Sequence, residues 1–369
     1  MTFPSVFETW PAVYAVADRY EIIVPVNKPT VMWVTVSGKN YYDDSNGILR
    51  SARLTHKMDV PMSELDSAGR YTVCWREVFN RKPYHSKLGD VESFTVGFRS
   101  VKQDNIHIYH ISDAHNAVEA PVAAGKFFGD DLDLLVLNGD IPDHSGKAEN
   151  FTAIHKIAGE ITHGELPVIF ARGNHDLRGV CAENLADYTP TDNGKSYYTV
   201  NLGSIWAAVL DCGEDKPDDD PEYGHTVCCH DFRVRQTEFL KKTAAYPENG
   251  FGAEDVKYKI VISHNPFPET HRPPFDIEKD IYTEWCDILK ASIRPDFILS
   301  GHVHNCYVTL PGEAKDCKGQ PCPVIAGSKP YREAPFFVGC AITLKDGIAD
   351  IRFTDPEGNI TDQTVLKLQ

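Results

Sequence analysis

The chain has 369 residues, of which 42% are hydrophobic and 24% are charged, as is ordinary for a globular protein. Its 37 Lys and Arg against 53 Asp and Glu give a formal net charge of −16. This acidic balance argues against binding to polymeric nucleic acid or to an anionic membrane, because both need a basic surface.

The length predicts two domains with a sizeable core. No stretch approaches the ~20 apolar residues of a membrane span. The N-terminus, Met1 to Pro4, lacks the charged and apolar regions of a signal peptide. We therefore expect a cytoplasmic protein without membrane contact, or an extracytoplasmic one if a leader has been removed. The ten cysteines are scattered, which favours reduced thiols over disulfides or a zinc knuckle.

Residues 1–103 are expected to form an all-β domain. Runs of β-branched and aromatic residues are separated by turn signals, at 20–26, 30–36, 70–78 and 92–98. Short strands at this spacing are typical of a small sandwich of the immunoglobulin or fibronectin kind. Its residues show no metal-ligand spacing, and a binding role for the module is the alternative to a purely structural one.

From residue 104 to residue 369, strands alternate with helical patterns, which predicts a second, α/β domain. Strands are expected at 106–111, 132–137, 167–171, 205–211, 259–264 and 296–304. Helices are expected at 117–128, 148–163, 232–245 and 280–291, and strands again after residue 323. The acidic stretch 214–222 is most simply a solvated loop.

Polar groups follow five of these apolar strands at the point where each strand ends. In an open α/β sheet, sites lie at the carboxyl ends of the strands, so these groups are expected to converge. Any one of them alone would be an ordinary turn or surface residue, but five in succession favour a shared site. The candidate metal ligands are Asp113, His115, Asp140, Asn174, His264, His302 and His304.

Seven candidate ligands are too many for one tetrahedral zinc ion and suit two ions that share a carboxylate. Carboxylate, amide and imidazole donors without thiolate favour manganese, iron or zinc as the two divalent or trivalent ions. Two ions ~3.5–4 Å apart can bind phosphate oxygens and lower the pKa of a bridging water. His175 follows Asn174 directly, where an imidazole can move a proton beside the metals.

The chain resembles the calcineurin-like metallophosphoesterase superfamily over residues 105–305. The resemblance rests on five blocks in the family's order: Asp113-Ala114-His115, Gly139-Asp140-Ile141-Pro142-Asp143, Gly173-Asn174-His175-Asp176, His264 and Gly301-His302-Val303-His304. It implies an α/β (α+β) four-layer sandwich of two mixed sheets flanked by helices. The β-sandwich in front of it is similar to that of purple acid phosphatase-like proteins.

The resemblance also implies roles for the candidate ligands. The first ion would be held by Asp113, His115, Asp140 and His304. Asp140 would bridge, and the second ion would be completed by Asn174, His264 and His302. The family assigns to the histidine of its Gly-Asn-His block, here His175, the protonation of the leaving alkoxide.

Three nearby residues have two interpretations each. Asp143 either orients His175, as in the protein-phosphatase branch, or caps the next loop. Arg172 either binds a substrate phosphate by paired hydrogen bonds or braces the site from behind. His144 either faces substrate or is a loop residue.

Two departures from the family patterns narrow the assignment. Purple acid phosphatases place a tyrosine where Asp143 stands, which argues against their Fe(III) charge-transfer chemistry. Protein Ser/Thr phosphatases place Asp-Arg-Gly where Asp143-His144-Ser145 stands, which argues against that branch as well.

We therefore expect a dimetal phosphoesterase that hydrolyses a small phosphomonoester or phosphodiester by attack of metal-bound hydroxide. The partner would be a small phosphorylated substrate, and the oligomeric state is left open. One alternative is a non-catalytic scaffold that binds a partner protein, although such relatives lose ligands that are all present here. Another is an envelope- or carbohydrate-associated enzyme that the β-sandwich targets.

Overall fold

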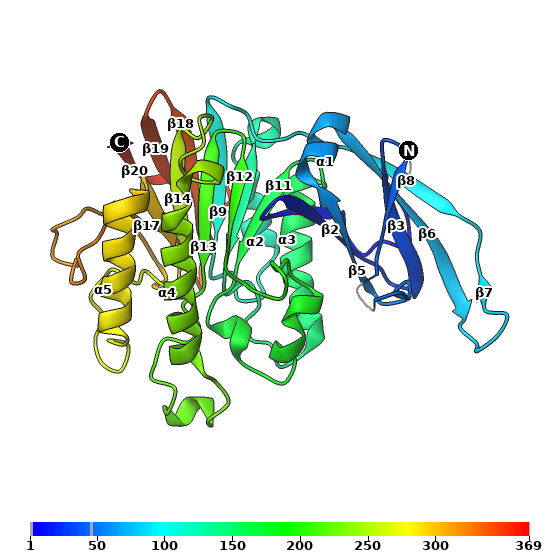
Figure 1. The fold of residues 1–369 in the computed structure, drawn as a ribbon, viewed down its shortest axis with the longest axis horizontal. Helices are drawn as coiled ribbons and strands as arrows, with labels where there is room; N and C mark the ends of the chain where they lie inside the picture. The colour runs from blue at the N-terminus through cyan, green and yellow to red at the C-terminus, as the bar shows by residue number, and fades with distance from the viewer. Residues whose placement is uncertain (1–2, 45–46, 369) are drawn as a thin grey trace.

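The computed structural model describes residues 3–44 and 47–368 and shows β-sheets flanked by helices (Figure 1). Residues 1, 2, 45 and 46 of the first predicted domain and residue 369 of the second lie outside this range. Residues 1 and 2 also belong to the N-terminal segment that was compared with a signal peptide. Within the described range, no helix is both long and apolar enough to cross a membrane. All ten cysteines lie within it and carry free thiols.

The first large sheet contains a parallel core of three strands that the sequence predicted. In spatial order they are β9, β10 and β11, and β18 lies antiparallel to β9 on the other side. The bounds are β9 Ile106–Ile111, β10 Leu134–Asn138, β11 Pro167–Ala171, β18 Phe337–Lys345, β19 Ile348–Thr354 and β20 Ile360–Lys367.

The second large sheet is also mixed. Strands β13, β14, β15 and β17 are parallel, while β12 and β16 are antiparallel neighbours at β13 and β17. The bounds are β12 Tyr198–Leu202, β13 Ile205–Leu210, β14 Tyr258–Ser263, β15 Phe297–Ser300, β16 Asn305–Thr309 and β17 Val324–Pro330. A short pairing of β17 with β18 joins this sheet to the first.

The two sheets pack face to face, and helices cover their outer faces. Side chains alternate along each strand, so Ile108 lies in the core between the sheets while the neighbouring Tyr109 packs on the helix side. The outer core of the first sheet includes Ile154 of α3, and that of the second includes Trp285 of α5. The predicted four-layer arrangement is confirmed.

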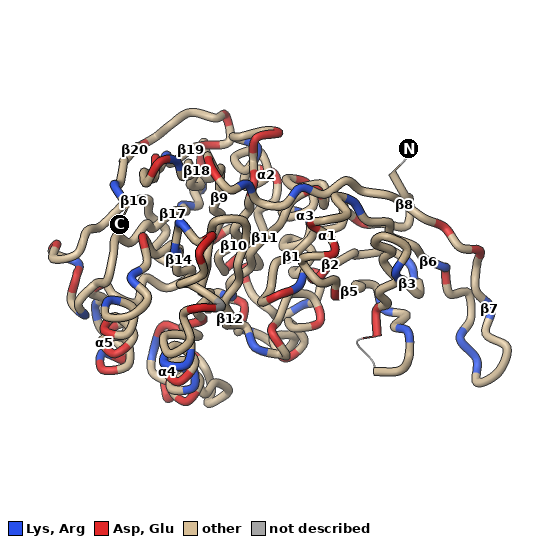
Figure 2. Tube along the Cα trace, turned by 45° about the horizontal axis from the view of Figure 1, so that its top comes forward, with Lys and Arg blue, Asp and Glu red and all other residues tan. Residues whose placement is uncertain are grey.

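Four helices form the outer layers: α2 Glu119–Gly125, α3 Thr152–Thr162, α4 Cys229–Ala245 and α5 Lys279–Ile288. Helix α3 buries the predicted apolar stripe, and α2 is shorter than expected. Helix α4 carries both acidic and basic residues, whereas α5 is mainly acidic after its first residue, Lys279 (Figure 2). The short turns are η1 Gly129–Asp131, η2 Ala148–Phe151, η3 His175–Leu177, η4 Ala182–Asp187, η5 Pro221–Tyr223, η6 Pro247–Asn249 and the π-helical η7 Leu289–Ile293.

The N-terminal module contains a separate antiparallel sheet and one helix, α1 Met62–Ala68. The sheet consists of β3 Thr30–Val36, β4 Lys39–Tyr42, β6 Arg70–Asn80, β7 Lys87–Leu88 and β8 Glu92–Gly97. A second group of strands faces it: β1 Ala12–Val16, β2 Arg19–Pro25 and β5 Thr55–Pro61.

The second group of N-terminal strands continues the first large sheet. β1 pairs in parallel with β11, through Val13 with Pro167 and Tyr14 with Val168, and β2 and β5 follow. Strand pairing therefore crosses the predicted domain boundary near residue 103.

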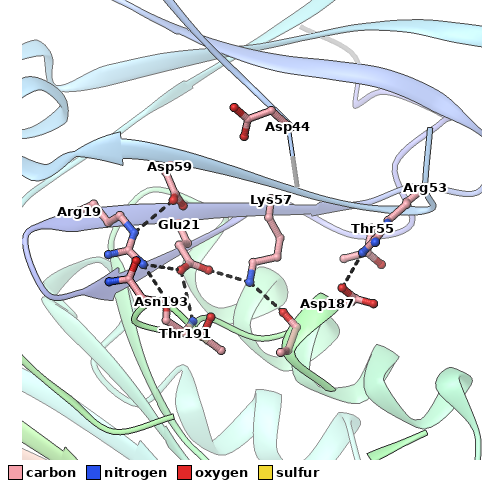
Figure 3. A pocket seen from close by; sticks show the side chains of 11 residues that line it. Arg19, Glu21, Asp44, Arg53, Thr55, Lys57, Asp59, Asp187, Thr191 and Asn193 are labelled. Atoms are coloured by element: carbon pink, nitrogen blue, oxygen red, sulfur yellow. Dashed lines mark hydrogen bonds and ion pairs between the residues drawn. The ribbon is translucent and has the colours of Figure 1, made fainter. Parts of the chain in front are cut away.

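A buried ionic cluster reinforces this junction (Figure 3). Glu21 of β2 is only 3% exposed and contacts Arg19 at 3.2 Å and Lys57 at 2.9 Å. Lys57 also donates to the main-chain carbonyls of Ala186 and Thr189. These contacts tie the N-terminal strands to the loop that precedes β12.

Candidate metal centre

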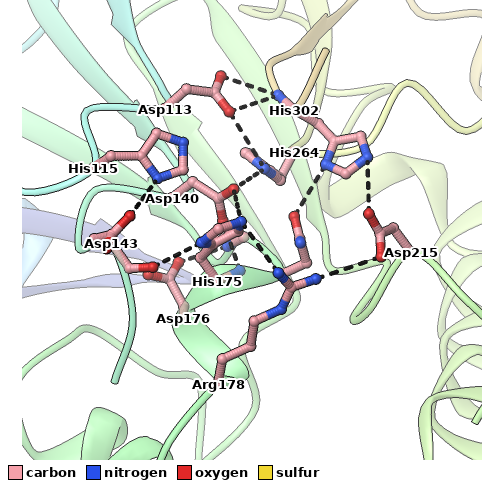
Figure 4. Close-up of polar contacts among 12 residues, drawn as sticks. Asp113, His115, Asp140, Asp143, His175, Asp176, Arg178, Asp215, His264 and His302 are labelled. Carbon is pink, nitrogen blue, oxygen red and sulfur yellow. Dashed lines mark hydrogen bonds and ion pairs between the residues drawn. The ribbon is translucent and has the colours of Figure 1, made fainter. Parts of the chain in front are cut away.

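The seven predicted ligands come together at the carboxyl ends of β9, β10, β11, β14 and β15 (Figure 4). Each apolar strand is buried between its neighbours, and the predicted ligands come after the point where the strand ends. The polar residues that follow therefore lie together at the carboxyl ends of the strands. Parallel pairing of neighbouring strands brings these ends side by side.

The first cluster consists of Asp113, His115 and His304. His304 Nε2 lies 3.4 Å from Asp113 Oδ1 and 3.0 Å from His115 Nε2. Two imidazoles and a carboxylate thus point their lone-pair atoms at one another, as ligands of a shared cation do.

The second cluster consists of Asp140, His264 and His302, with Asn174 beside them. His264 Nε2 lies 3.1 Å from Asp140 Oδ2 and 3.8 Å from Asp113 Oδ1, which links the two clusters. His302 Nδ1 donates to Asn174 Oδ1 at 3.0 Å.

The loops between strand and ligand are tightly folded. Asp113, Asp140 and His302 have φ values of 53°, 52° and 68°, a region that residues other than glycine rarely adopt. Gly139 and Gly173 lie so close together that a Cβ at Gly139 would come within 2.5 Å of the Gly173 nitrogen. Side-chain-free backbone is therefore required where the β10 and β11 loops meet, and backbone strain of this kind is typical of functional sites.

The electrostatics of the cluster fit a bound cation. Asp113 and Asp140 are buried. Burial raises the pKa of Asp140, but the charges and hydrogen bonds of His264 and His175 together outweigh burial and hold that pKa well below its usual range. Burial lowers the pKa of His264, yet the charges of Asp140 and Asp113 raise it to about 10. Paired buried carboxylates thus demand positive charge.

The donor atoms support the same conclusion. His264 Nδ1 donates to the Asn138 carbonyl at 2.6 Å, which fixes the ring and directs its Nε2 at the carboxylates. That buried Nε2 has no partner with hydrogen-bond geometry among the described residues, and neither has His115 Nδ1. The set of oxygen and imidazole donors without thiolate is consistent with a dimetal site.

His175 lies at the rim of this cluster. Its Nδ1 donates to the main-chain carbonyl of Asp143 at 2.7 Å, and its Nε2 lies 4.0 Å from Asp140 Oδ2. Arg178 Nη1 donates to the same Nε2 at 3.3 Å. Fixing Nδ1 as a donor leaves Nε2 as the atom that faces the cluster.

Asp143 accepts the hydrogen bond of His175 through its backbone, and its carboxylate lies within 4.8 Å of ring nitrogens of both His115 and His175. Its carboxylate is about half exposed and lies 3.5 Å from His115 Nδ1. His144, in the same loop, accepts a hydrogen bond from the Gly146 nitrogen at 2.9 Å and is exposed. His144 is thus a loop residue.

Arg172 is not brought into the cluster. Its Nε donates to Asp211 Oδ2 at 2.6 Å, and its guanidinium lies over the ring of Phe232.

The neighbouring Asp176 is buried and accepts from the Gly173 nitrogen at 2.6 Å. Burial, together with the charge of Asp140, raises the pKa of Asp176 to about 8.

The acidic stretch 214–222 contains site residues that the sequence did not identify. Arg178 makes a two-pronged pair with Glu214, with both nitrogen–oxygen distances at 2.9 Å, and lies 3.5 Å from Asp215. Asp215 Oδ2 also lies 3.6 Å from His302 Nε2 (Figure 4). Glu214 and Asp215 are buried, so the expectation of a wholly solvated loop is wrong for these two residues.

A cavity of about 340 Å³ opens beside the cluster. It is lined by Asp140, Asn174, His175, Asp215, His271, Arg272, Phe275, His302, Val303 and His304. Candidate ligands form one wall and the loop after β14 forms another, so a small molecule can reach the ligands and His175 together.

Sequence comparison matches residues 106–306 to the family described as Calcineurin-like phosphoesterase. A protein of Fibrobacter succinogenes named "Probable cyclic nucleotide phosphodiesterase" is 36% identical over 84 residues. The aligned segment covers 23% of this chain and only 31% of that protein.

Two solved structures share the fold, including the N-terminal β-module. The purple acid phosphatase PPD1 from yellow lupin (Lupinus luteus) seeds has a TM-score of 0.61 at 12% identity, covering 98% of this chain and 75% of its own. PhoD has a TM-score of 0.54 at 11% identity, covering 100% of this chain and 90% of its own.

Proposed function

The chain belongs to the calcineurin-like phosphoesterase family, and from this premise we propose that it is a dimetal-dependent hydrolase of a small phosphomonoester or phosphodiester. The observation that carries the proposal is the meeting of seven ligand-type side chains in two linked clusters beside an open cavity.

The two linked clusters would each hold one ion. Asp113, His115 and His304 would bind the first ion, and Asn174, His264 and His302 the second. Asp140 would bridge them. When bound, such ions attract phosphate oxygens and lower the pKa of a coordinated water, which is the activation that ester hydrolysis needs.

His175 is proposed as the proton donor to the leaving group. The Asp143 carbonyl holds its Nδ1, so its Nε2 lies toward the cavity. This nitrogen accepts from Arg178 in the structure, so it would take up a proton and release Arg178 before it donates to the leaving group. A positioned imidazole of this kind can transfer a proton to or from a reacting group. Arg178 in turn is fixed by Glu214, which keeps the rim of the cavity in place.

The proposed substrates include phosphomonoesters and phosphodiesters. The name of the Fibrobacter succinogenes relative supports a diester, but the alignment with that protein covers 84 residues. The acidic chain favours a small substrate over a polymer, because polymeric nucleic acid needs a basic surface.

The test is metal analysis of the purified protein combined with turnover of p-nitrophenyl phosphate and bis(p-nitrophenyl) phosphate under added Mn²⁺, Fe²⁺ or Zn²⁺. We expect two equivalents of metal and metal-dependent hydrolysis of at least one ester. Asp140→Asn should weaken the binding of both ions. Asp130→Asn changes an exposed carboxylate that precedes the start of β10 and should leave metal binding unchanged. Two bound equivalents without turnover of either ester would contradict the proposal and favour the scaffold alternative.

A further inference from the structure

The loop after β14, residues 265–278, contributes side chains to the same cavity as the candidate ligands. Three of its side chains, His271, Arg272 and Phe275, line the cavity together with Asn174 and His302. The ligands account for the chemistry of the reacting phosphate. The loop side chains therefore face whatever part of a substrate extends away from the metals.

Arg272 differs from the other cations around the site. Arg178 is paired with Glu214 and Lys216 with Glu222. Two further arginines near the site also have carboxylate partners: Arg172 contacts Asp211 and Arg233 contacts Glu278. Among the described residues, the exposed side chain of Arg272 has neither an ion pair nor a hydrogen bond.

An unpaired arginine at this place is informative because the chain carries a net charge of −16. Acidic surface repels anionic ligands, and only a local cation offsets that repulsion. Guanidinium groups bind carboxylates and phosphates through two parallel hydrogen bonds. Arg272 thus has the chemistry and the free donors to take an anion.

The backbone around Arg272 is held in place. Glu278, at the end of the loop, accepts from Arg233 at 3.0 Å, and Thr270 donates to the Lys315 carbonyl at 2.8 Å. Between them, the Arg272 carbonyl accepts from the Phe275 nitrogen at 2.8 Å. Pro273 and Pro274 fix their own φ angles, so the loop loses little freedom when a ligand binds.

Phe275 supplies an apolar surface beside Arg272. Its ring is 39% exposed and lines the cavity, and Lys216 Nζ lies 5.4 Å from the ring centroid. The lining of the cavity thus includes both the aromatic ring of Phe275 and the positively charged side chain of Arg272. Such a lining fits a substrate body with a charge at its far end.

We propose that Arg272 binds a second anionic group of the substrate, so that the substrate is a phosphoester that carries another phosphate or carboxylate group. The body that joins the two groups would lie against Phe275. This inference rests on the proposed hydrolytic function, and it adds to that function a class of substrate.

The test is isothermal titration calorimetry of the Mn²⁺-loaded full-length chain with phosphonates, which are not hydrolysed. Three alkylphosphonates, with ethyl, propyl and butyl chains, are compared with counterparts of the same lengths that end in a carboxylate. We expect at least one carboxylated probe to bind about 10–100-fold more tightly than its alkyl counterpart, the range for charge-assisted hydrogen bonds.

Substitutions test whether Arg272 causes the tighter binding of the carboxylated probes. Arg272→Gln should abolish it while alkylphosphonate binding changes less than about twofold, and Arg272→Lys should keep part of it. Arg294→Gln, which alters an exposed arginine just before β15 at the opposite edge of the sheet, should behave as the parent protein. Metal content and melting temperature check that each variant is folded.

The outcomes separate the two proposals. If alkylphosphonates do not bind the metal-loaded parent protein, the proposed function fails and this inference fails with it. If they bind but no carboxylated probe gains affinity, or Arg272→Gln keeps the gain, only this inference is overturned. If Arg272→Gln weakens both probe series equally, Arg272 contacts the reacting phosphate and the second-anion assignment is wrong.

Discussion

The main-chain carbonyl of Asp143, rather than its carboxylate, accepts the hydrogen bond from His175 Nδ1 at 2.7 Å. The Asp143 carboxylate lies instead beside His115. The ring of His175 is therefore oriented by backbone geometry, which any side chain at position 143 can provide. This relationship bears on one of the two interpretations of Asp143, that it orients His175: in the structure the orienting acceptor is its backbone carbonyl.

Asp143→Asn should have little effect on proton transfer. The substitution keeps the carbonyl that holds His175, so we expect kcat for an ester with a poor leaving group, such as phenyl phosphate, to fall by less than about threefold. Steady-state kinetics with phenyl phosphate measure this directly. A loss as large as that of His175→Ala would show that the carboxylate itself acts in catalysis.

His175→Ala should retain both metals and lose most turnover of esters with poor leaving groups. The expected loss in kcat is about 10²–10⁴-fold, the range for general acid catalysis. Esters with p-nitrophenol as leaving group should lose less, because that leaving group needs less protonation. His144→Ala is the matched control, and an unchanged rate for the poor leaving group in His175→Ala would assign the acid role elsewhere.

Asp215→Asn should lower the affinity for one of the two metal ions. Because Asn174 lies beside His302 Nδ1, the other ring nitrogen of His302 faces the Asp215 carboxylate at 3.6 Å. Loss of a carboxylate behind a ligating histidine typically costs about 10–100-fold in metal affinity. Competition with a chelator should show this loss for the second ion alone, and Asp219→Asn, an exposed change in the same loop, should show none.

His155 should make the fold sensitive to mild acid. Burial lowers its pKa to about 4, with the charge of Lys57 adding to the effect, and neither ring nitrogen has a hydrogen-bond partner among the described residues. Between this pKa and the ordinary value of 6.5, the unfolded chain binds more protons than the folded one. The free energy of unfolding therefore falls as the pH drops through this window, by about 3 kcal/mol from His155 alone.

His155→Phe removes this contribution while it keeps an aromatic ring at the site. Denaturant unfolding at pH 7 and pH 4.5 should show a smaller loss of stability in His155→Phe than in the parent protein. His85→Gln, an exposed change in the hairpin between β6 and β7, should leave the pH dependence unchanged. Equal pH dependence in His155→Phe and the parent protein would contradict the assignment.

Glu21→Gln should loosen the junction shown in Figure 3. The change leaves Arg19 and Lys57 without their shared buried carboxylate. Hydrogen bonds to charged groups contribute about 1.5–3 kcal/mol, so we expect a loss of that size in denaturant unfolding. Glu77→Gln removes an exposed contact with Lys28 and should cost at most about 1 kcal/mol. Similar losses for both variants would mean that burial does not strengthen the cluster.

The sequence predicted the parts of the fold and site that depend on local order. An apolar strand followed directly by polar residues is visible in the chain, and the seven candidate ligands were found in this way. The burial of Glu214 and Asp215 was not predictable, because their partner Arg178 lies 36 and 37 residues away. The same applies to Arg172, whose preference for Asp211 depends on how β11 and β13 are brought together.

Strand β1 shows a second limit of local patterns. Its five residues, Ala12–Val16, are all buried and lack the alternation that marks a half-exposed strand. The pairing with β11 spans more than 150 residues of sequence and depends on the shape of the whole sheet.

That pairing also decides how the protein can be divided. A truncation at the change of composition near residue 103 would remove β1 and leave the backbone of β11 as an open edge. Unpaired strand edges recruit other strands and promote aggregation. The N-terminal module therefore serves as the protective border of the sheet that carries Asn174 and His175, and a shortened version of this protein should keep it.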